Sequence, residues 1–445
     1  MDITENISMG KSLAYYEGQK ILIDGGYAGQ KANICILKMK PARWEASFVE
    51  ALAHADYETD PLCADFSRCG GCKFQDITYE KQLAFKEHYV RELFRKAKIP
   101  YTVFEPILPS PLVWGYRNKM EFSFGDEVKD GELTLGMHEK GRHHNIVSLR
   151  ECMISPDDFN TVRTACETYF RDLGETHFST YKKSGFLRHL VLRHSFAKNE
   201  ILINLVTTGE KSFDADSFAD MILALPMQYN IAGILHTISN SQSDAVKPDS
   251  VRLLYGEDFL TESLCGLDFR ISPFSFFQTN SKGAEVLYSK VREYAGDTAD
   301  KTIFDLYCGT GTITQVMAHG AKQAVGIEIV PEAIKAAKQN AHINRIENCE
   351  FICGDVLEKV DELKGKADII ILDPPRAGIH PKAIDKIIAF APETFIYVSC
   401  KATSLIGELP KFLEAGYEVK SVCPVDMFPH TEHVETVILL QRRSS

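Results

Sequence analysis

The stretch FDLYCGTGTIT, residues 304–314, constrains the fold of this 445-residue chain more than any other. It has the pattern of a buried strand, a glycine turn and a helix start, and Gly309 and Gly311 would let the backbone approach a ligand closely. Apolar strands recur nearby in AVGIEIV, ADIIILDPPRAG and TFIYVSC, and several run into helical segments. This alternation predicts a doubly wound α/β sheet in residues 271–445, with ligands at the carboxyl ends of the strands.

Acidic residues at the ends of these strands indicate which ligand the sheet binds. The chain lacks the G-x-G-x-x-G fingerprint of dinucleotide sites and the G-x-x-x-x-G-K-[ST] loop that holds a triphosphate. Instead, Glu328 could accept hydrogen bonds from both ribose hydroxyls, Asp355 could meet an adenine amino group, and Asp373 ends a further strand. Acid-tipped strands after a G-x-G turn favour S-adenosylmethionine. A Rossmann-like fold with another ligand is the alternative.

The motif DPPR, residues 373–376, narrows the class of methyltransferase. Enzymes that methylate exocyclic amines tend to carry an aromatic residue after the two prolines, where it stacks on a flipped base. Arg376 stands there instead, and its fork of donors suits a base edge rich in carbonyls. RNA cytosine carbon-5 enzymes place a cysteine just after the proline of this motif. None is present here, which disfavours cytosine as the substrate.

Cys400 follows the strand-forming run FIYVS and is the candidate nucleophile. Carbon 5 of a pyrimidine is a poor nucleophile, but thiolate addition at carbon 6 creates an enolate that can attack a methyl sulfonium. A base must then remove the carbon-5 proton so that the thiol leaves by elimination. Glu435 is the better candidate base, since His430 and His433 could simply cap or pack. A buried, inert thiol is the alternative for Cys400.

The motifs DLYCGTGT, DPPRAG, YVSC and DMFPHTEHVE together resemble those of the RNA uracil-C5 methyltransferases, and the resemblance is closest to the 23S ribosomal RNA branch. It covers nearly the whole chain. It implies that Cys400 is the nucleophile, that Glu435 is the base, and that Asp373 and Arg376 orient the uracil. One departure is visible, because the family commonly has Asn-Pro after the catalytic cysteine and this chain has Lys401-Ala402.

The same resemblance extends to the cofactor site. PFSFFQTN, residues 273–280, is similar to a family signature whose glutamine contacts the cofactor. The resemblance also implies that Tyr307 and Glu328 line this site. With the residues of the strand ends, the predicted S-adenosylmethionine contacts are Gln278, Tyr307, Gly309, Gly311, Glu328, Asp355 and Asp373.

The N-terminal half separates into two regions. Residues 1–57 carry short alternating runs split by a Gly-Gly turn, which predicts a small β-barrel or sandwich, or else a sheet extension of the next domain. This region is similar to the TRAM domain, a small RNA-binding β-barrel. Residues 58–270 are expected to form an α+β domain, with helices over 79–98 and 215–227 and strands in runs such as HLVLRHSF. In the first helix, Leu83, His88, Tyr89, Leu93 and Phe94 lie near helical spacing.

A cysteine cluster opens the second region. CADFSRCGGC places Cys63, Cys69 and Cys72 in a C-x5-C-x2-C pattern, and Cys152 is the predicted fourth ligand of a metal centre. Radical S-adenosylmethionine enzymes use C-x3-C-x2-C, and zinc sites usually show two C-x2-C pairs. A 4Fe–4S cluster fits best, as in the ribosomal branch, with zinc or no metal as alternatives. We expect a structural role with some contact to RNA.

A second cysteine pair and the charge distribution are less informative. Cys349 and Cys353 alternate within a strand and are expected to pack in the core. The net charge of −11 argues mildly against nucleic acid, although basic stretches occur at 139–150 and 182–194. From charge alone, both are expected to be solvated surface strands or turns.

The first residues show no signal peptide, and no apolar run reaches the ~20 residues of a membrane helix. We therefore expect a cytoplasmic protein. Its expected oligomeric state is a monomer.

These features predict an enzyme that methylates carbon 5 of a uridine in 23S ribosomal RNA through a covalent intermediate on Cys400. Transfer RNA is the alternative substrate. The cysteine cluster and N-terminal barrel argue against it, because the transfer-RNA branch generally lacks both. A non-catalytic RNA-binding assembly factor is the alternative of another class. The intact set of Asp373, Cys400 and Glu435 argues against that reading.

Overall fold

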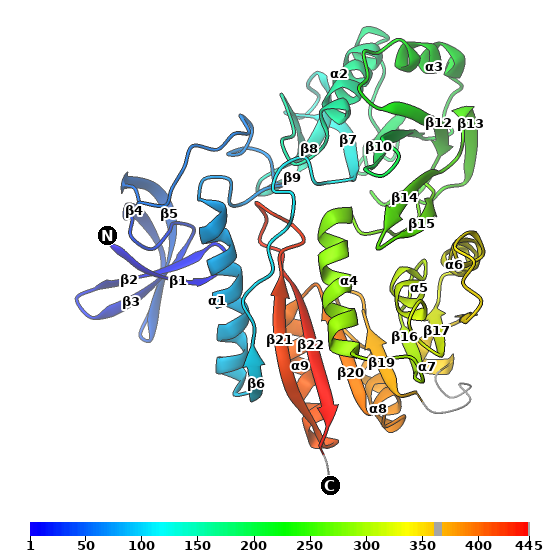
Figure 1. The fold of residues 1–445 in the computed structure, drawn as a ribbon. Helices are drawn as coiled ribbons and strands as arrows, with labels where there is room; N and C mark the ends of the chain where they lie inside the picture. Colours follow the sequence, from blue (N-terminus) through cyan, green and yellow to red (C-terminus); the bar gives the residue numbers. More distant parts are fainter. Residues whose placement is uncertain (360–366, 444–445) are drawn as a thin grey trace. The chain divides into compact units, whose positions relative to one another are not determined.

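A computed structural model describes residues 1–359 and 367–443 of the chain (Figure 1). The chain divides into two compact units, which are described separately. Unit 1 consists of Met1–Leu62, Cys72–Ser110 and Ile371–Ser445, and unit 2 consists of Cys63–Gly71 and Pro111–Ile370. None of the helices within the described ranges is long and apolar enough to cross a membrane.

Unit 1 begins with a five-stranded sheet whose strands confirm the alternating runs of the N-terminal sequence. The strands are β1 (Ile3–Ser8), β2 (Lys11–Tyr16), β3 (Gln19–Asp24), β4 (Lys31–Lys40) and β5 (Arg43–Ala53), in the order β1-β2-β3-β5-β4. All neighbouring strands are antiparallel except β3 and β5. Gly25 and Gly26 have positive φ angles, and they form the predicted turn after β3. Ile3, Ile21 and Ile23 form part of its small core.

The remainder of unit 1 packs helices against a second group of strands. These elements are α1 (Tyr79–Ala97), β6 (Tyr101–Phe104), α8 (Pro381–Ala389), β20 (Thr394–Ser399), α9 (Ala402–Glu414), β21 (Tyr417–Val425) and β22 (Glu435–Arg442). The strands follow the order β20-β22-β21-β6, with antiparallel pairing except between β21 and β6. Helices α1 and α9 contact each other and β21 (Figure 1).

Helix α1 confirms the helix predicted over 79–98, but its buried face differs from the expected apolar residues. The buried side chains are Gln82, Lys86, Val90 and Phe94, which recur every four residues. Of the residues noted for their spacing, only Phe94 belongs to this stripe. The stripe therefore carries two polar side chains at positions where an apolar pattern would be expected.

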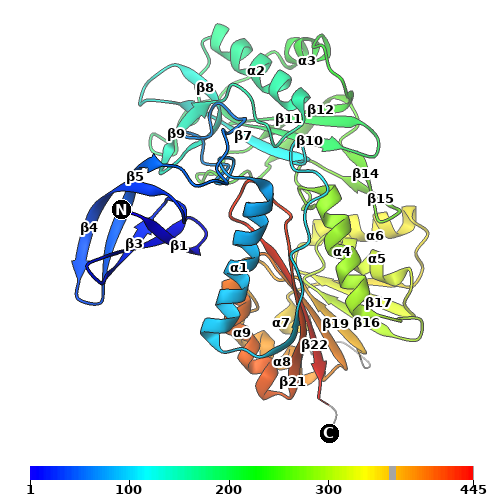
Figure 2. The ribbon, with the colours of Figure 1, turned by 60° about the vertical axis from the view of Figure 1, so that its left-hand side comes forward.

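Unit 2 contains a seven-stranded sheet with helices on one face. Its strands are β7 (Lys119–Asp126), β8 (Leu133–Glu139), β9 (Arg142–Ser148), β10 (Leu187–Ser195), β11 (Glu200–Thr207), β12 (Asn230–Ile238) and β13 (Ser250–Gly256), in the order β13-β12-β11-β10-β7-β8-β9. Helices α2 (Asp157–Asp172) and α3 (Ala215–Leu223) share an apolar core with this sheet (Figure 2). Helix α3 confirms the helix predicted over 215–227 but ends earlier, because Pro226 disfavours helical geometry at the residue before it.

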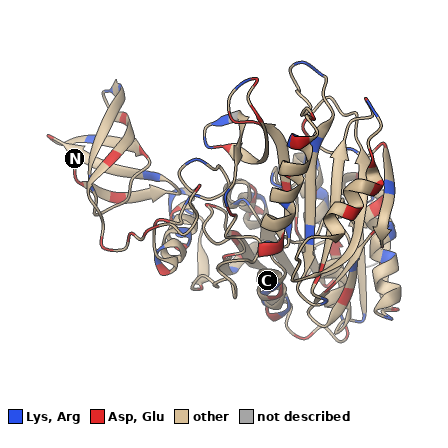
Figure 3. Cartoon of the chain, turned by 90° about the horizontal axis from the view of Figure 1, so that it is seen from above, with Lys and Arg blue, Asp and Glu red and all other residues tan. Residues whose placement is uncertain are grey.

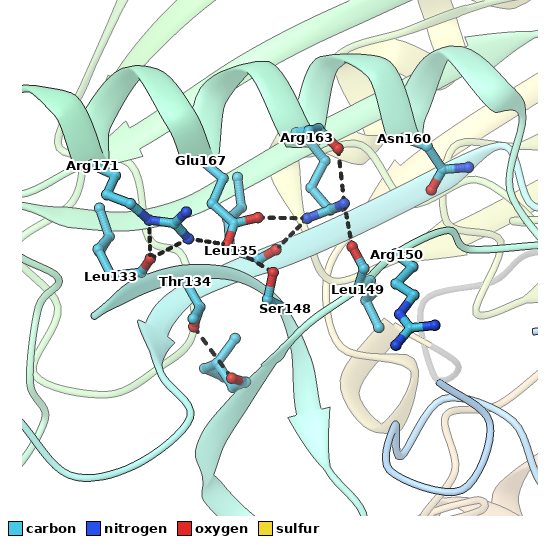
Figure 4. Close-up of polar contacts among 12 residues, drawn as sticks. Leu133, Thr134, Leu135, Ser148, Leu149, Arg150, Asn160, Arg163, Glu167 and Arg171 are labelled. Carbon is cyan, nitrogen blue, oxygen red and sulfur yellow. Dashed lines mark hydrogen bonds and ion pairs between the residues drawn. The ribbon is translucent and has the colours of Figure 1, made fainter. Parts of the chain in front are cut away.

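A buried arginine connects α2 to the sheet beneath it (Figure 4). Arg163 donates hydrogen bonds to the carbonyl oxygens of Leu135, at 3.0 Å, and Leu149, and it pairs with Glu167 at 2.8 Å. Glu167 also pairs with Arg171 at 2.7 Å. Burial lowers the pKa of Arg163, and the charge of Glu167 opposes this effect. The guanidinium thus holds two backbone segments of the sheet under the helix.

The stretch 182–194 was expected to be a solvated surface strand or turn. Lys182 and Lys183 are exposed as expected, but the two arginines that follow are buried. Arg188 and Arg193 lie on β10 and are each only 3% exposed. Arg188 donates to the carbonyl oxygens of Ser239, at 3.2 Å, and Ser241, at 2.6 Å. Burial lowers the pKa of Arg193 to about 10. Both side chains therefore satisfy buried backbone rather than face solvent, whereas Lys140 at the β8–β9 turn is exposed as expected. Figure 3 shows acidic and basic residues intermixed along the strands and helices.

The strand–helix alternation predicted from FDLYCGTGTIT is confirmed in unit 2. Strands β16 (Thr302–Leu306), β17 (Gln323–Glu328) and β18 (Cys349–Cys353) are parallel, in the order β18-β17-β16. They alternate with α5 (Thr312–Ala318), α6 (Pro331–Ile343) and α7 (Val356–Lys359), and the hairpin of β14 (Leu260–Leu264) and β15 (Leu267–Ile271) and helix α4 (Ser281–Ala295) precede them. The division between the units falls within β19 (Ile369–Leu372).

The two cysteines of β18 behave differently. Cys349 packs against a small apolar core, as predicted. Cys353 is exposed, so the prediction that it packs in the core is wrong. It is the last residue of its strand, and only Phe351, at the centre of the strand, is buried.

Candidate active site

Strand pairing in unit 1 brings the candidate nucleophile beside the candidate base. Ser399, the last residue of β20, pairs with Thr436 of β22. Because these strands are antiparallel, the next residue on one strand, Cys400, lies beside the preceding residue on the other, Glu435. Glu435 pairs in turn with Val425 on β21, and its side chain is buried. Two residues 35 positions apart in the sequence thus meet at one end of the sheet.

The charges around this pair raise the pKa values of both groups. Burial, followed by the carboxylates of Glu435 and Asp373, raises the pKa of the Cys400 thiol to about 11, and Arg376 opposes this effect. Burial and then Asp373 raise the pKa of Glu435 to about 8, again opposed by Arg376. The structure therefore brings Asp373, Arg376, Cys400 and Glu435 within electrostatic reach of one another.

Helix α9 holds the DPPR loop from the side. Ser404 Oγ donates to the carbonyl oxygen of Arg376 at 3.1 Å, and Glu408 Oε1 accepts from the amide of Ile379 at 2.9 Å. Gly378 has a φ of 85°, and a Cβ atom there would lie 2.0 Å from Glu408 Oε1. The backbone of the loop is thereby fixed, while the guanidinium of Arg376 is exposed to solvent.

Lys401 and Ala402, which stand where the family commonly has Asn-Pro after the candidate nucleophile, lie at the start of α9. Lys401 precedes the helix, and its amide donates to Ser399 Oγ at 3.2 Å. Ala402 is the first helical residue and is buried. The chain passes from strand to helix within the two residues after β20, so Cys400 lies on a short and well-connected turn.

The glycine turn of unit 2 has the backbone geometry of a ligand loop. Tyr307, Gly309 and Gly311 all have positive φ angles, and the amide of Tyr307 donates to the carbonyl oxygen of Ile327 at 3.0 Å. A Cβ atom on Gly309 would lie 3.8 Å from the ring of Phe276, which is an ordinary contact distance. On Gly311 it would lie 2.5 Å from the ring of Phe351. Gly309 therefore suits ligand approach, whereas Gly311 is required for packing.

The acid at the tip of β17 is joined to this turn. Glu328 accepts from the amide of Gly309 at 3.1 Å with one oxygen and from the amide of Val330 at 3.0 Å with the other. Asp355, two residues beyond β18, is exposed, and it accepts from the amide of Leu357 at 2.9 Å at the start of α7. Both carboxylates therefore already have a backbone partner, and each oxygen can accept a second hydrogen bond.

The segment PFSFFQTN lies against the same glycine turn. Thr310 Oγ1 donates to the carbonyl oxygen of Phe276 at 3.2 Å, and Asn118 Nδ2 donates to that of Gln278 at 2.9 Å. The side chain of Gln278 is half-buried. Six of the seven predicted cofactor contacts thus belong to unit 2, and Asp373 belongs to unit 1.

Three of the four predicted metal ligands come together in unit 2. Burial raises the pKa of Cys69 to about 11, and the charges of Cys152 and Cys63 add to this effect. Cys63 Sγ donates to the carbonyl oxygen of Glu151 at 3.5 Å. Within residues 1–359 and 367–443, however, no group of three or more Cys, His, Asp or Glu side chains has the arrangement of a metal site. The fourth cysteine, Cys72, belongs to unit 1.

One buried pair of charged residues next to the strand that pairs with Glu435 was not predicted from the sequence. Lys86 of α1 and Asp426, at the end of β21, form an ion pair of 2.6 Å in which both side chains are fully buried. Its signal was a lysine on the i, i+4 stripe of α1, which cannot be distinguished in sequence from a solvated lysine.

The comparisons with known proteins identify the family. The model described as tRNA (Uracil-5-)-methyltransferase matches residues 78–443. The chain belongs to this family. It is therefore an RNA methyltransferase, which disfavours the non-catalytic assembly factor.

Relatives match along the whole chain. An uncharacterized RNA methyltransferase from Clostridium tetani is 46% identical over 438 residues, which cover 98% of this chain and 96% of the relative. Another, from Caldanaerobacter subterraneus, is 44% identical over 433 residues, which cover 97% and 96%. Among solved structures, the Pyrococcus abyssi tRNA (uracil-54, C5)-methyltransferase in complex with S-adenosyl-L-homocysteine is 26% identical, with a TM-score of 0.77 over 99% of each chain.

The raised pKa of Glu435 predicts a pH-dependent cost to stability. Its pKa rises from an ordinary 4.5 to about 8 in the folded chain, so folding keeps a proton that the unfolded chain releases. The contribution of Glu435 to stability is fully present below about pH 4.5 and is lost as the pH rises through about 8. Glu435→Gln should therefore stabilise the protein increasingly over this range, with a plateau above it. Thermal unfolding midpoints of both proteins from pH 5 to pH 9 measure this difference.

Glu414→Gln, at an exposed position of α9, is the matched control and should show no such trend. A constant difference between Glu435→Gln and the unsubstituted protein across this pH range would contradict the raised pKa.

Proposed function

We propose that this enzyme transfers a methyl group from S-adenosylmethionine to carbon 5 of a uridine in RNA, through a covalent bond between Cys400 and carbon 6 of the uracil. The observation that carries the proposal is the strand register that lays Cys400 beside Glu435, within electrostatic reach of Asp373 and Arg376. Family membership supports the reaction, and the S-adenosyl-L-homocysteine bound to the Pyrococcus abyssi enzyme supports the methyl donor.

The proposed reaction has two stages. The Cys400 thiolate adds to carbon 6, and the electrons of the C5–C6 double bond move into an enolate. Carbon 5 then takes the methyl group from the sulfonium, whose S–CH3 bond breaks to leave S-adenosylhomocysteine. Glu435 removes the proton from carbon 5, the double bond re-forms, and the C6–S bond breaks to return the Cys400 thiolate.

The electrostatics of the site suit the roles of Glu435, Arg376 and Asp373, whereas the raised pKa of Cys400 opposes formation of the thiolate. A carboxylate whose pKa is about 8 is a far stronger base than an ordinary glutamate, and general bases work best with a pKa near the working pH. The exposed guanidinium of Arg376 would donate to a uracil carbonyl and stabilise the enolate oxygen. Asp373 would accept the hydrogen bond of the ring N–H. A target base must leave its stack to reach these groups.

The methyl donor would bind along the strand ends of unit 2. In this proposal Glu328 receives the ribose hydroxyls, Asp355 meets the adenine, and the ligand approaches the backbone at Gly309. Tyr307, Gly311 and Gln278 would complete the contacts, with Asp373 from the DPPR motif.

Two substitutions separate the stages of the reaction. Cys400→Ala should abolish both methylation and any covalent RNA adduct, because no sulfur is available to attack carbon 6. Glu435→Gln should instead accumulate a methylated adduct that survives denaturing electrophoresis, since the proton on carbon 5 cannot leave. Labelled RNA and denaturing gels measure both outcomes.

Cys353→Ala, which removes an exposed thiol, is the control and should behave as the unsubstituted enzyme. Normal turnover by Cys400→Ala would rule out the covalent mechanism, and normal turnover by Glu435→Gln would remove that residue as the base.

The RNA substrate that we propose is a folded, partly single-stranded segment of 23S ribosomal RNA. A TRAM-like barrel over 1–57 and a central domain over 58–270 would grip the RNA, and residues 271–445 would carry out the transfer in a monomeric enzyme. Transfer RNA is the second candidate, for a specific reason. The Pyrococcus abyssi transfer-RNA enzyme aligns over 99% of this chain, so the extent of the chain alone does not distinguish the two substrates.

An in vitro assay with both RNAs tests this choice. Methyl incorporation into unmodified 23S ribosomal RNA, with at least tenfold less into unmodified transfer RNA, is the expected result. The reverse preference would identify transfer RNA as the substrate while leaving the chemistry at Cys400 unchanged. Mass spectrometry of the labelled RNA then locates the modified uridine.

We also propose a structural 4Fe–4S cluster on Cys63, Cys69, Cys72 and Cys152. The donor set suits it, because four thiolates are the usual ligands of such clusters, and three of these thiols lie within electrostatic reach of one another. Protein purified without oxygen should contain iron and acid-labile sulfide in equal amounts. Cys69→Ser should lose both, while Cys265→Ser, another half-buried thiol of unit 2, should lose neither. Zinc without sulfide, or no metal at all, would contradict the proposal.

A further inference from the structure

The loop that leads to Glu435 is anchored by a fully buried charge. We define the base loop as residues 426–434, between β21 and β22. Lys86 Nζ, on α1, lies 2.6 Å from Asp426 Oδ1, and neither side chain has any exposed surface. The same ammonium donates to the carbonyl oxygen of Phe428 at 2.9 Å. One side chain therefore holds the loop both through a carboxylate and through its backbone.

Two further side chains of α1 bind the same loop. Tyr79 donates its hydroxyl to Asp426 Oδ2 at 2.9 Å. Gln82 accepts from the amide of His430 at 2.8 Å and shares a hydrogen bond of 3.1 Å with Nδ1 of that histidine. The three residues recur along one side of the helix at positions 79, 82 and 86, so α1 presents a polar row to the base loop.

The backbone of the base loop is held at its centre as well. The amides of Lys73 and Phe74 both donate to the carbonyl oxygen of His430, at 2.7 and 3.0 Å. His430 has a φ of 65°, a left-handed geometry that costs a residue with a side chain free energy. Lys73 also pairs with Glu432 at 2.6 Å. The loop thus adopts one strained conformation that surrounding contacts determine.

Stability alone does not account for the buried ion pair. Burial lowers the pKa of Lys86, and the charge of Asp426 opposes this effect. Removing two charges from water costs several kcal/mol each, and replacement of such a pair by apolar residues is often neutral or stabilising. A charged pair with several hydrogen bonds is directional, however, and it fixes a position that apolar contacts would leave variable.

The Lys86–Asp426 pair lies where it can fix the position of Glu435. Asp426 directly follows Val425, and Val425 is the β21 residue that pairs with Glu435. Glu435 is the first residue of β22, so the base loop determines how that strand begins. A shift of Asp426 therefore transmits to Glu435 through the strand pair, and Glu435 must lie beside Cys400 to reach carbon 5.

We propose that Lys86 is a positioning residue for Glu435, which acts by holding the base loop through Asp426 and Phe428. The inference rests on the function proposed above. Lys86 touches neither the substrate nor the reacting atoms, and its effect falls on the proton-removal step. Misplacement of a catalytic group by about 1 Å can slow a reaction by about 100-fold.

The test uses the full-length enzyme with Lys86→Met/Asp426→Asn. Asparagine keeps one oxygen, which can accept from the amide of Phe428 as Asp426 Oδ1 does at 3.1 Å. No charge is left buried alone, so the variant should fold with a thermal midpoint close to that of the unsubstituted protein. Turnover should fall about 10- to 100-fold. The fraction of RNA in the denaturation-resistant adduct should rise at least threefold, because proton removal is slowed and thiolate addition is not.

Lys96→Met is the matched control, since it removes a lysine from the exposed side of the same helix. It should leave turnover and the adduct fraction unchanged. Tyr79→Phe removes the hydrogen bond to Asp426 and the one that the hydroxyl accepts from the amide of Ser110, but it leaves the Lys86–Asp426 pair intact. It should raise the adduct fraction by a smaller factor. This milder substitution decides the question if the double variant does not fold.

Three outcomes are distinguishable. A purely structural role would lower turnover and adduct in proportion to the folded fraction, and this result would overturn the proposal. Turnover and adduct equal to those of the unsubstituted enzyme would also overturn it. Glu435→Gln serves as the reference for the proposed function, because its failure to accumulate adduct would reject the mechanism itself rather than the role of Lys86.

Discussion

The antiparallel register between β20 and β22 is the constraint on which the candidate site depends. It places Cys400 beside Glu435 through the direct pairing of the two strands. A slip of one residue would turn every side chain of the strand to the opposite face. All six residues of β20 are buried, so such a slip would require both faces of the strand to repack. The chemistry of the site is therefore determined by the same burial that holds the sheet together. The pKa of Glu435 follows from its place within that sheet.

Local sequence patterns predicted the elements well and their polar interior poorly. The strands of the first 53 residues, helix α1 and the parallel strands around the glycine turn followed from alternation and turn residues alone. The environment of Arg188 and Arg193 did not, because the carbonyl groups that receive them belong to segments 50 to 80 residues away. A charged side chain in a strand is read as exposed unless its distant partner is known.

The candidate site shows the same division. Cys400, Glu435, Asp373 and Arg376 could be selected from motif chemistry, and the strand register explains why they share a location. Lys86 and Asp426 could not, since their pairing joins residues 340 positions apart. Asp426 opens the motif DMFPHTEHVE, but nothing in that motif indicates a lysine of α1 as its partner. The two glycines of the turn also looked equivalent in sequence. Only packing separates Gly309, where a Cβ atom would lie at an ordinary contact distance, from Gly311, where it would clash with Phe351.

The distance along the chain between Lys86 and Asp426 has a consequence for synthesis. Helix α1 is synthesised well before the carboxylate that neutralises its lysine, which follows 340 positions later in the chain. Until then the helix cannot bury its polar stripe without leaving a charge unpaired in a low-dielectric interior. The same segment carries the candidate base, Glu435. A chain that stopped before Asp426 would therefore lack both the partner of Lys86 and the candidate base.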